Sequence, residues 1–209
     1  MNGIVLTLST VLFLGCSAPY AFLDEEPPAE GTPVAETRRA SYPGSETPQV
    51  ERRVLVYPGG RVERHGVEHE WYPDGTLRSE RSYDHGRPDG VWRSWYEGGA
   101  KRSEVDFGDR VHPAPMRFWH PGGEIAGEGQ GIAGVKEGTW SYWNEEGAKL
   151  SEGSYFAGVR DGPWTFWYPG GVKRAEGSYA GGLRVGEWRL WDEEGNLVVR
   201  QASADLRAE

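Results

Sequence analysis

The sequence predicts an all-β protein: a single elongated, twisted antiparallel sheet of stacked β-hairpins, each 24 residues long. Tryptophan recurs at this interval in one column, formed by Trp71, Trp95, Trp119, Trp143, Trp167 and Trp191. A glycine column keeps the same interval: Gly75, Gly99, Gly123, Gly147, Gly171 and Gly195. The chain holds 31 Gly and 14 Pro in 209 residues, which disfavours long helices. Because an isolated hairpin is marginal in water, successive units must pair edge to edge, giving about twelve strands and a sheet on the order of 60 Å long.

Each unit carries the turn chemistry of a hairpin. Trp71-Tyr72-Pro73-Asp74-Gly75 and Trp167-Tyr168-Pro169-Gly170-Gly171 place Pro early and Gly late in the turn. Pro presets φ there and Gly accepts a positive φ. Six units cover about Gly66 to Gln201, and Tyr57-Pro58-Gly59-Gly60 indicates a shortened unit before them.

A second tryptophan column stands three residues before the first and is assigned a structural role. It holds Trp92, Trp140, Trp164 and Trp188, so the two columns contain all ten Trp of the chain. Strand alternation puts the two columns on opposite faces of the sheet. We expect rings of one unit to stack on those of the next and to hold neighbouring hairpins in register.

The motif from Gly162 to Gly171, Gly-Pro-Trp-Thr-Phe-Trp-Tyr-Pro-Gly-Gly, followed by Gly177-Ser178-Tyr179 and Gly182, resembles the MORN-repeat variant of bacterial proteins, including those labelled YwqK-type antitoxins. The resemblance spans roughly Val54 to Val199. It implies a sheet of stacked hairpins and an interaction role.

Residues 1–15 are predicted to be a signal peptide of the lipoprotein type. The apolar run before Cys16 is too short to span a bilayer and suits a secretory signal. Phe13-Leu14-Gly15-Cys16 resembles a bacterial lipoprotein box, which implies cleavage before Cys16 and lipidation of that residue. The expected location is therefore the bacterial cell envelope, lipid-anchored in the periplasm or on the outer surface. A plain secretory signal and a secreted protein are the alternative.

Residues 16–50 are predicted to be a disordered Pro/Glu-rich tether. From Ser17 to Val50 they hold six Pro and six acidic residues against Arg38 and Arg39, too few apolar groups to order the segment. The repeat domain is expected over 51–201, followed by a tail at 202–209. The net charge of −9, without a basic run, argues against a nucleic-acid partner.

Two interpretations of the Trp71–Trp191 column stay open. Its rings either stabilise the sheet or form a candidate binding strip for an unidentified protein partner, since exposed aromatic patches mark binding sites. The leading prediction is a non-catalytic, envelope-anchored lipoprotein that acts as a protein interaction scaffold. The alternatives are an antitoxin or immunity protein and a carbohydrate- or cell-wall-binding module.

No enzyme activity, cofactor or metal site is expected. The column Glu80, Glu104, Glu128, Glu152 and Glu176 is interpreted as an ion-pairing position, with Arg78, Arg102 or Arg174 as partners, because acid–base catalysis needs two carboxyls in different environments. His65 and His69 have the spacing that chelates zinc on a helix, but on a strand they lie about 13 Å apart. They are interpreted as solvated edge histidines.

Overall fold

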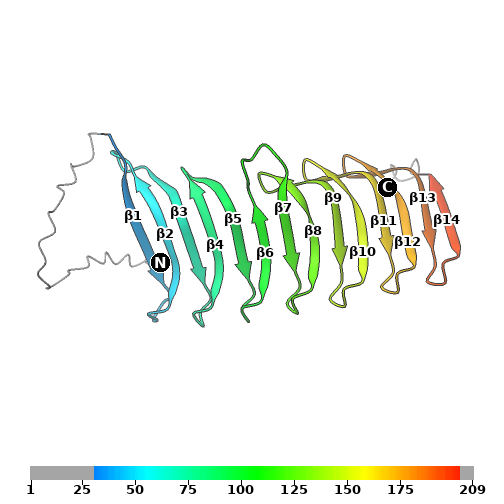
Figure 1. Cartoon of the computed structure of the whole chain (residues 1–209), viewed down its shortest axis with the longest axis horizontal. Coiled ribbons are helices and arrows are strands. Elements are labelled where there is room, and N and C mark those ends of the chain that lie inside the picture. The colour runs from blue at the N-terminus through cyan, green and yellow to red at the C-terminus, as the bar shows by residue number, and fades with distance from the viewer. Residues whose placement is uncertain (1–30, 203–209) are drawn as a thin grey trace, which may run out of the picture.

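The computed structural model describes residues 31–202, which form one open antiparallel sheet of 14 strands and contain no helix (Figure 1). Every strand pairs with its neighbours in sequence, so the sheet consists of seven consecutive hairpins. The predicted all-β sheet of stacked hairpins is confirmed. The strands are β1 (Val34–Ser41), β2 (Pro48–Val56), β3 (Val62–Trp71), β4 (Leu77–Asp84), β5 (Arg87–Trp95), β6 (Lys101–Asp106), β7 (Ala114–Trp119), β8 (Ile125–Ile132), β9 (Val135–Trp143), β10 (Lys149–Phe156), β11 (Val159–Trp167), β12 (Lys173–Ala180), β13 (Leu183–Trp191) and β14 (Leu197–Ala202).

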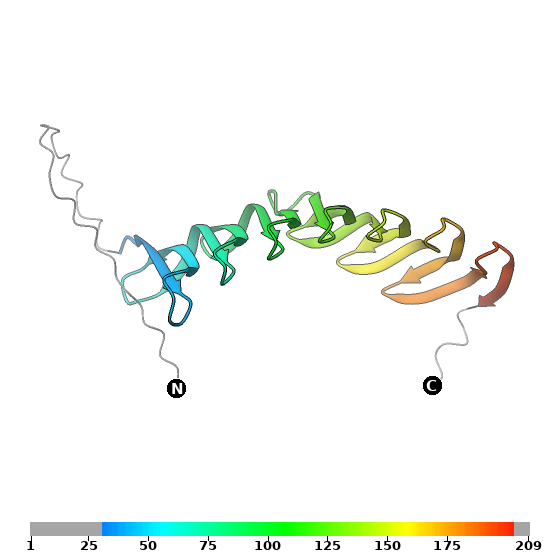
Figure 2. The same ribbon diagram turned by 90° about the horizontal axis from the view of Figure 1, so that it is seen from below.

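The sheet is a long, shallow arc, with β1 at one end and β14 at the other (Figure 2). Since each strand forms its backbone ladder only with its immediate neighbours, stability is assembled from one repeat interface after another. Within residues 31–202 there is no helix with the length and apolar character needed to cross a membrane.

Most turns on the two long edges of the sheet are of two different kinds. On one edge, the turn after β3 is closed by hydrogen bonds from Tyr72 N to Thr76 O (2.9 Å) and from Gly75 N to Tyr72 O (2.9 Å). The six glycines of this column have φ between 78° and 99°, which explains why only glycine occupies it. Four of the six turns on the opposite edge have two residues with positive φ at both positions, as in type I′ hairpins: His85-Gly86, Ala133-Gly134, Ala157-Gly158 and Gly181-Gly182. The β2–β3 turn on this edge is instead closed from Tyr57 N to Arg61 O at 2.8 Å, so the predicted shortened unit at Tyr57-Pro58-Gly59-Gly60 is wrong: this turn joins two successive hairpins.

The predicted tether is wrong from Val34 onward, because β1 and the start of β2 lie within it. Tyr42 opens a turn of the same kind as Tyr72, with Tyr42 N bonded to Thr47 O at 3.1 Å. The Tyr42 hydroxyl also donates to the carbonyl of Trp71 at 2.7 Å. The sheet edge provided by β3 orders β2, which in turn orders β1, although their composition is too polar to form a core alone. The predicted signal peptide, Cys16 with the first half of the tether, and the tail beyond Ala202 lie outside the described residues.

Five of the six contacts between successive hairpins include a hydrogen bond from a turn side chain; the exception is the β9–β10 hairpin, whose turn opens with Asn144. The Tyr72 hydroxyl donates to the carbonyl of Trp95 (2.9 Å), and the Tyr168 hydroxyl donates to that of Trp191 (3.0 Å). The same contact recurs from Tyr96 to Trp119 and, through an imidazole nitrogen, from His120 to Trp143. The first residue of each of these turns therefore joins one repeat to the following one.

The core is built from tryptophans that lie on glycines. Trp140, Trp164 and Trp188 are 0%, 1% and 3% exposed. Each indole covers a glycine on the preceding strand, and a Cβ added there would lie 2.5, 2.2 and 2.3 Å from the ring at Gly129, Gly153 and Gly177, respectively.

A β-bulge beside each indole allows this approach. The ladder shifts register by two residues at Trp140 and at Trp188. The extra residues on the tryptophan strand include Gly138, with a φ of 66°. The indole N–H of Trp140 donates to Gln130 O at 2.8 Å, and that of Trp164 donates to Ser154 O at 3.0 Å. The glycines that open the repeats thus provide the bulge that the tryptophans need.

Successive core tryptophans are bridged by an intervening ring rather than stacked on each other. Tyr142 lies between Trp140 and Trp164, with ring centres 6.0 and 6.4 Å away and planes within 25° of parallel. Phe166 lies in the same way between Trp164 and Trp188. The result is one continuous aromatic stripe along the C-terminal half of the sheet.

Replacing Gly153 by Ala is expected to destabilise the protein by about 1–3 kcal/mol, because the new methyl group overlaps the ring of Trp164. Urea unfolding followed by circular dichroism measures the loss. Gly170→Ala is the matched control, since that glycine has an ordinary φ and open space around its Cβ. Equal unfolding midpoints for the two variants would contradict the role assigned to the Trp–Gly contact.

Candidate functional site

The two faces of the sheet differ in chemistry. The aromatic face carries the core tryptophans together with Tyr83, Tyr155 and Tyr179, whose rings contact the core indoles edge-on or tilted. The polar face carries the column Trp71, Trp95, Trp119, Trp143, Trp167 and Trp191 with the glutamate column. All six of these tryptophans are half-buried.

Lysines cover part of the candidate binding strip on the polar face. The Nζ of Lys101 lies 5.1 Å from the ring centre of Trp119, and that of Lys173 lies 5.3 Å from Trp191. Lys149 lies between Trp143 and Trp167, at 5.8 and 5.6 Å. These distances fit cation–π contacts, so the indoles interact with this chain's own cations along much of the strip.

The glutamate column forms ion pairs with residues of its own face. Glu104 contacts Arg93 Nε at 3.3 Å and Lys101 Nζ at 3.0 Å. Glu176 contacts Arg189 and Lys173 in the same way, and Glu152 pairs with Lys149. Hydrogen bonds from the lysines hold the pKa values of Glu104, Glu152 and Glu176 below their usual range. These carboxylates are therefore ionised at neutral pH and link adjacent strands.

The partners suggested by the sequence for the glutamates were wrong. Arg78 and Arg102 lie 5.8 Å from the ring centres of Tyr72 and Tyr96, and Arg174 lies 5.9 Å from Phe166. Register shifts at the start of β4, β6 and β12 leave these arginines as extra residues in the ladder. As a result, these arginines lie on the aromatic face, whereas the glutamates lie on the polar face.

Cations cover the aromatic face in its C-terminal half. A basic column with the 24-residue spacing contributes Lys136, Arg160 and Arg184, which lie 4.4, 4.4 and 4.2 Å from the ring centres of Trp140, Trp164 and Trp188. Burial lowers the pKa of Lys136, whose Nζ lies 2.6 Å from the Tyr142 hydroxyl. The stripe is thus closed there by the protein's own side chains.

The N-terminal half of the aromatic face is hollowed into a groove of about 480 Å³. Ser94 stands where later repeats have Phe118, Tyr142, Phe166 and Leu190. It hydrogen-bonds Ser103 on the next strand at 2.6 Å, and this small pair leaves space above it. The groove is lined by Trp92, Phe107 and Phe118 and by four arginines, Arg78, Arg81, Arg93 and Arg102.

A buried carboxylate stands beside this groove in the first full repeat. Glu68 occupies the core tryptophan column and is 2% exposed. Three guanidinium groups approach it, from Arg52 (3.6 Å), Arg64 (3.5 Å) and Arg81 (3.8 Å), yet no hydrogen bond reaches either oxygen. Arg81 also pairs with Glu70 at 3.3 Å. By contrast, no carboxylate of the described chain lies within ion-pair distance of Arg78 or Arg102.

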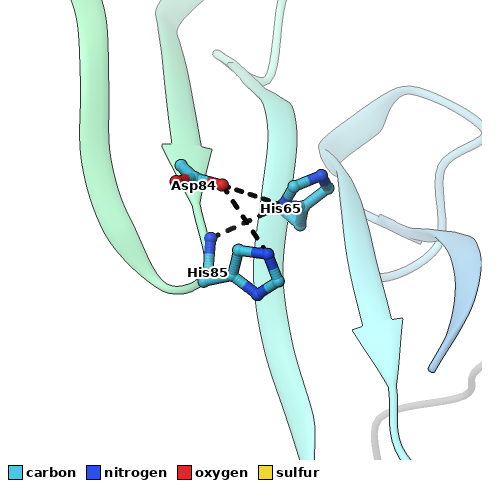
Figure 3. Close-up of side chains that lie close together, drawn as sticks. All are labelled: His65, Asp84 and His85. Carbon is cyan, nitrogen blue, oxygen red and sulfur yellow. Dashed lines mark hydrogen bonds and ion pairs between the residues drawn. The ribbon is translucent and has the colours of Figure 1, made fainter. Parts of the chain in front are cut away.

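The histidines identified in the sequence lie apart from each other. His69 contacts Glu80 at 3.3 Å and lies beside Trp71. His65, however, lies beside Asp84 and His85 at the β4–β5 turn (Figure 3). Sequence reasoning missed this group because it considered spacing along one strand only. The hairpin register, which pairs Gly66 with Tyr83, is the signal that brings the three residues together.

The fold and its repeats define a protein of stacked β-hairpins, the architecture of MORN repeats. The family model described as the MORN repeat variant matches two segments, residues 64–85 and 160–180. The first segment covers most of β3 and β4, and the second covers most of β11 and β12. The two matches therefore fall on equivalent hairpins of the repeat. No curated protein matches the chain. MORN repeats indicate a repeat-based binding scaffold.

Lowering the pH is expected to destabilise the protein partly through Glu176. Its pKa is lowered in the folded state, first by the hydrogen bond from Lys173. Its contribution is therefore full above the ordinary carboxyl range and is lost as pH falls through that range. Urea midpoints at pH 6 and pH 3 should differ less in Glu176→Gln than in the wild type. Glu193→Gln, in an exposed turn, should behave as the wild type does; if it matches Glu176→Gln instead, the assignment fails.

Proposed function

We propose that the protein is a non-catalytic scaffold, anchored in the bacterial cell envelope, whose groove on the aromatic face binds an acidic segment of a partner protein. The observation that carries the proposal is the pair Arg78 and Arg102, two arginines that have no carboxylate within ion-pair distance among residues 31–202, on a chain of net charge −9. MORN repeats as a class supply the scaffold role.

The arginine spacing favours an extended segment. Arg78 follows the start of β4 and Arg102 that of β6, so the two lie two strand positions apart, roughly 10 Å. In an extended peptide, side chains on one face recur every second residue. Acids four residues apart, about 13 Å, therefore face both arginines and leave one further side chain of the same face between them. Each guanidinium presents a planar fork that binds a carboxylate through two hydrogen bonds. The partner is thus expected to carry two acidic residues at this spacing.

The floor of the groove favours an apolar or aromatic side chain between those two acids. Trp92 is half-buried, with its ring centre 4.7 Å from that of Phe107. Pockets that combine aromatic walls with arginine concentrate binding energy in protein interfaces. The C-terminal half of the same face lacks this opening, because Lys136, Arg160 and Arg184 lie over its rings.

Replacing Arg102 by Ala is expected to weaken binding of an extended peptide with two Glu four residues apart and a Phe midway between them by about tenfold, the effect of losing one charged hydrogen-bonding group. Fluorescence anisotropy of the labelled peptide measures the affinity, with a Lys-for-Glu peptide as the negative probe. Arg174→Ala is the matched control, because Arg174 occupies the same column outside the groove.

Equal losses in the Arg102 and Arg174 variants would contradict the groove assignment. A response to cell-wall glycans, with none to acidic peptides, would favour the carbohydrate-binding alternative. Rescue of growth from one co-expressed toxin, independent of Arg78 and Arg102, would favour the antitoxin alternative.

The envelope anchor is proposed from the lipoprotein-box resemblance of Phe13-Leu14-Gly15-Cys16, the only cysteine of the chain. Acyl chains on Cys16 would bind the bilayer in proportion to their buried methylene groups. Cys16→Ser is therefore expected to move the protein from the membrane fraction to the soluble fraction, as measured by fractionation and immunoblotting. Ser9→Ala, within the apolar run, is the control that retains the thiol. Membrane retention of the Cys16→Ser protein would overturn the anchor.

A further inference from the structure

We propose that His65, Asp84 and His85 form a binding site for a divalent transition-metal ion, with Zn²⁺ the best chemical match. The three side chains converge where the β4–β5 turn meets β3 (Figure 3). One ligand atom from each lies within 4.8 Å of the other two. Two imidazoles and one carboxylate are ligands that zinc accepts, and three protein ligands leave a fourth position for water.

The distances fit a tetrahedral ion after small side-chain movements. His65 Nδ1 lies 3.5 Å from Asp84 Oδ1, and His85 Nε2 lies 3.8 Å from the same oxygen. Ligand bonds of about 2.0–2.1 Å in a tetrahedron place neighbouring ligand atoms roughly 3.3 Å apart. The side chains are 40% exposed at His65 and 56% exposed at Asp84 and His85, so rotation and entry of the ion are unobstructed.

A hydrogen-bond chain behind His85 orients its ring for metal binding. The Tyr57 hydroxyl donates to Glu63 Oε2 at 2.8 Å, so its oxygen is left to accept from His85 Nδ1 at 3.1 Å. Glu63 Oε2 itself lies 3.6 Å from the same nitrogen. A proton held on Nδ1 leaves the lone pair on Nε2, the nitrogen that faces Asp84. Metal-binding histidines are commonly oriented by such a hydrogen bond from the other ring nitrogen.

The other repeats show that the turn does not require these residues. The same two-residue turn is made by Ala133-Gly134, Ala157-Gly158 and Gly181-Gly182. The positions equivalent to Asp84 there are Ile132, Phe156 and Ala180. His85 takes a φ of 44°, a conformation that Gly or Asn adopts more easily.

In two of the other two-residue turns, the residue at the position of His65 accepts a hydrogen bond that closes the turn. His65 forms a longer and weaker version of this bond. Glu137 and Asp161 accept the backbone N–H of Ala157 and Gly181 at 3.0 and 3.1 Å. His65 Nδ1 makes the same contact with His85 N at 3.4 Å. An acid would close this turn better, so the imidazole lone pair is open to a stronger partner. Ligand-type residues thus coincide at all three positions only in this turn among these four.

Isothermal titration of the purified full chain, free of a histidine tag and stripped with chelator, tests the site with Zn²⁺ alone. One saturable site per chain is expected. His85→Asn, which keeps a residue suited to the turn, and His65→Asn, which keeps an acceptor for the turn N–H, should each weaken binding at least about tenfold. Glu63→Gln, which alters only the supporting chain, should weaken it about tenfold as well.

His112→Asn is the matched control, because His112 forms an exposed pair with Asp109 at 2.6 Å without a second histidine. It should bind Zn²⁺ as the wild type does. The visible spectrum of a Co²⁺ complex, lost in His85→Asn, gives an independent readout of tetrahedral nitrogen and oxygen ligands. The absence of saturable Zn²⁺ binding, or equal affinities in His85→Asn and His112→Asn with circular dichroism unchanged, would overturn the site.

Discussion

The close approach of an indole to a glycine is the contact on which the rest of the sheet depends. Trp164 can be almost completely buried in a single-layer sheet only because Gly153 has no side chain and because the bulge at Gly162 aligns the ring with the neighbouring strand. The intervening rings Tyr142 and Phe166 then extend the contact into a continuous stripe. A core one residue thick is stable here because aromatic side chains bury much area for each residue fixed.

This constraint also explains where the protein is free to vary. In the N-terminal repeats the glycine beneath the indole is replaced, by Arg81 next to Trp92, and the core tryptophan itself is replaced by Glu68. The packing there is looser, and Trp92 is only half-buried. Ordered repeats on the C-terminal side and the hairpin β1–β2 on the other side hold this region in the sheet. Departures from local consistency that the rest of a fold tolerates are expected at functional sites.

The sequence predicted the strands and turns that repeat, but it missed the register shifts inside each repeat and the features that occur once. Columns of Trp and Gly at 24-residue spacing predict the strands, the turns and the two faces, because the same pattern recurs in every repeat and supports the same assignment each time. The hairpin β1–β2 was missed because Tyr42 lies 30 residues before Tyr72 and so falls outside the 24-residue period. Its polar composition also gives no sign that β2 pairs with the edge of β3. The sequence shows Ser94 as the small residue in a column of larger apolar ones. That this leaves a groove could be recognised only from the structure, which places Arg78 and Arg102 beside it.

The groove and the histidine group draw on the same hairpins but on different parts of them. Ser79 and Ser94 lie on the aromatic face in the middle of paired strands β4 and β5, where rigid pairing fixes the groove. His85 lies at the tip of the β4–β5 turn, where side chains are exposed and can rearrange around an ion. The proposed binding groove and the proposed metal site therefore do not compete for residues, since no side chain that lines the groove belongs to the histidine group.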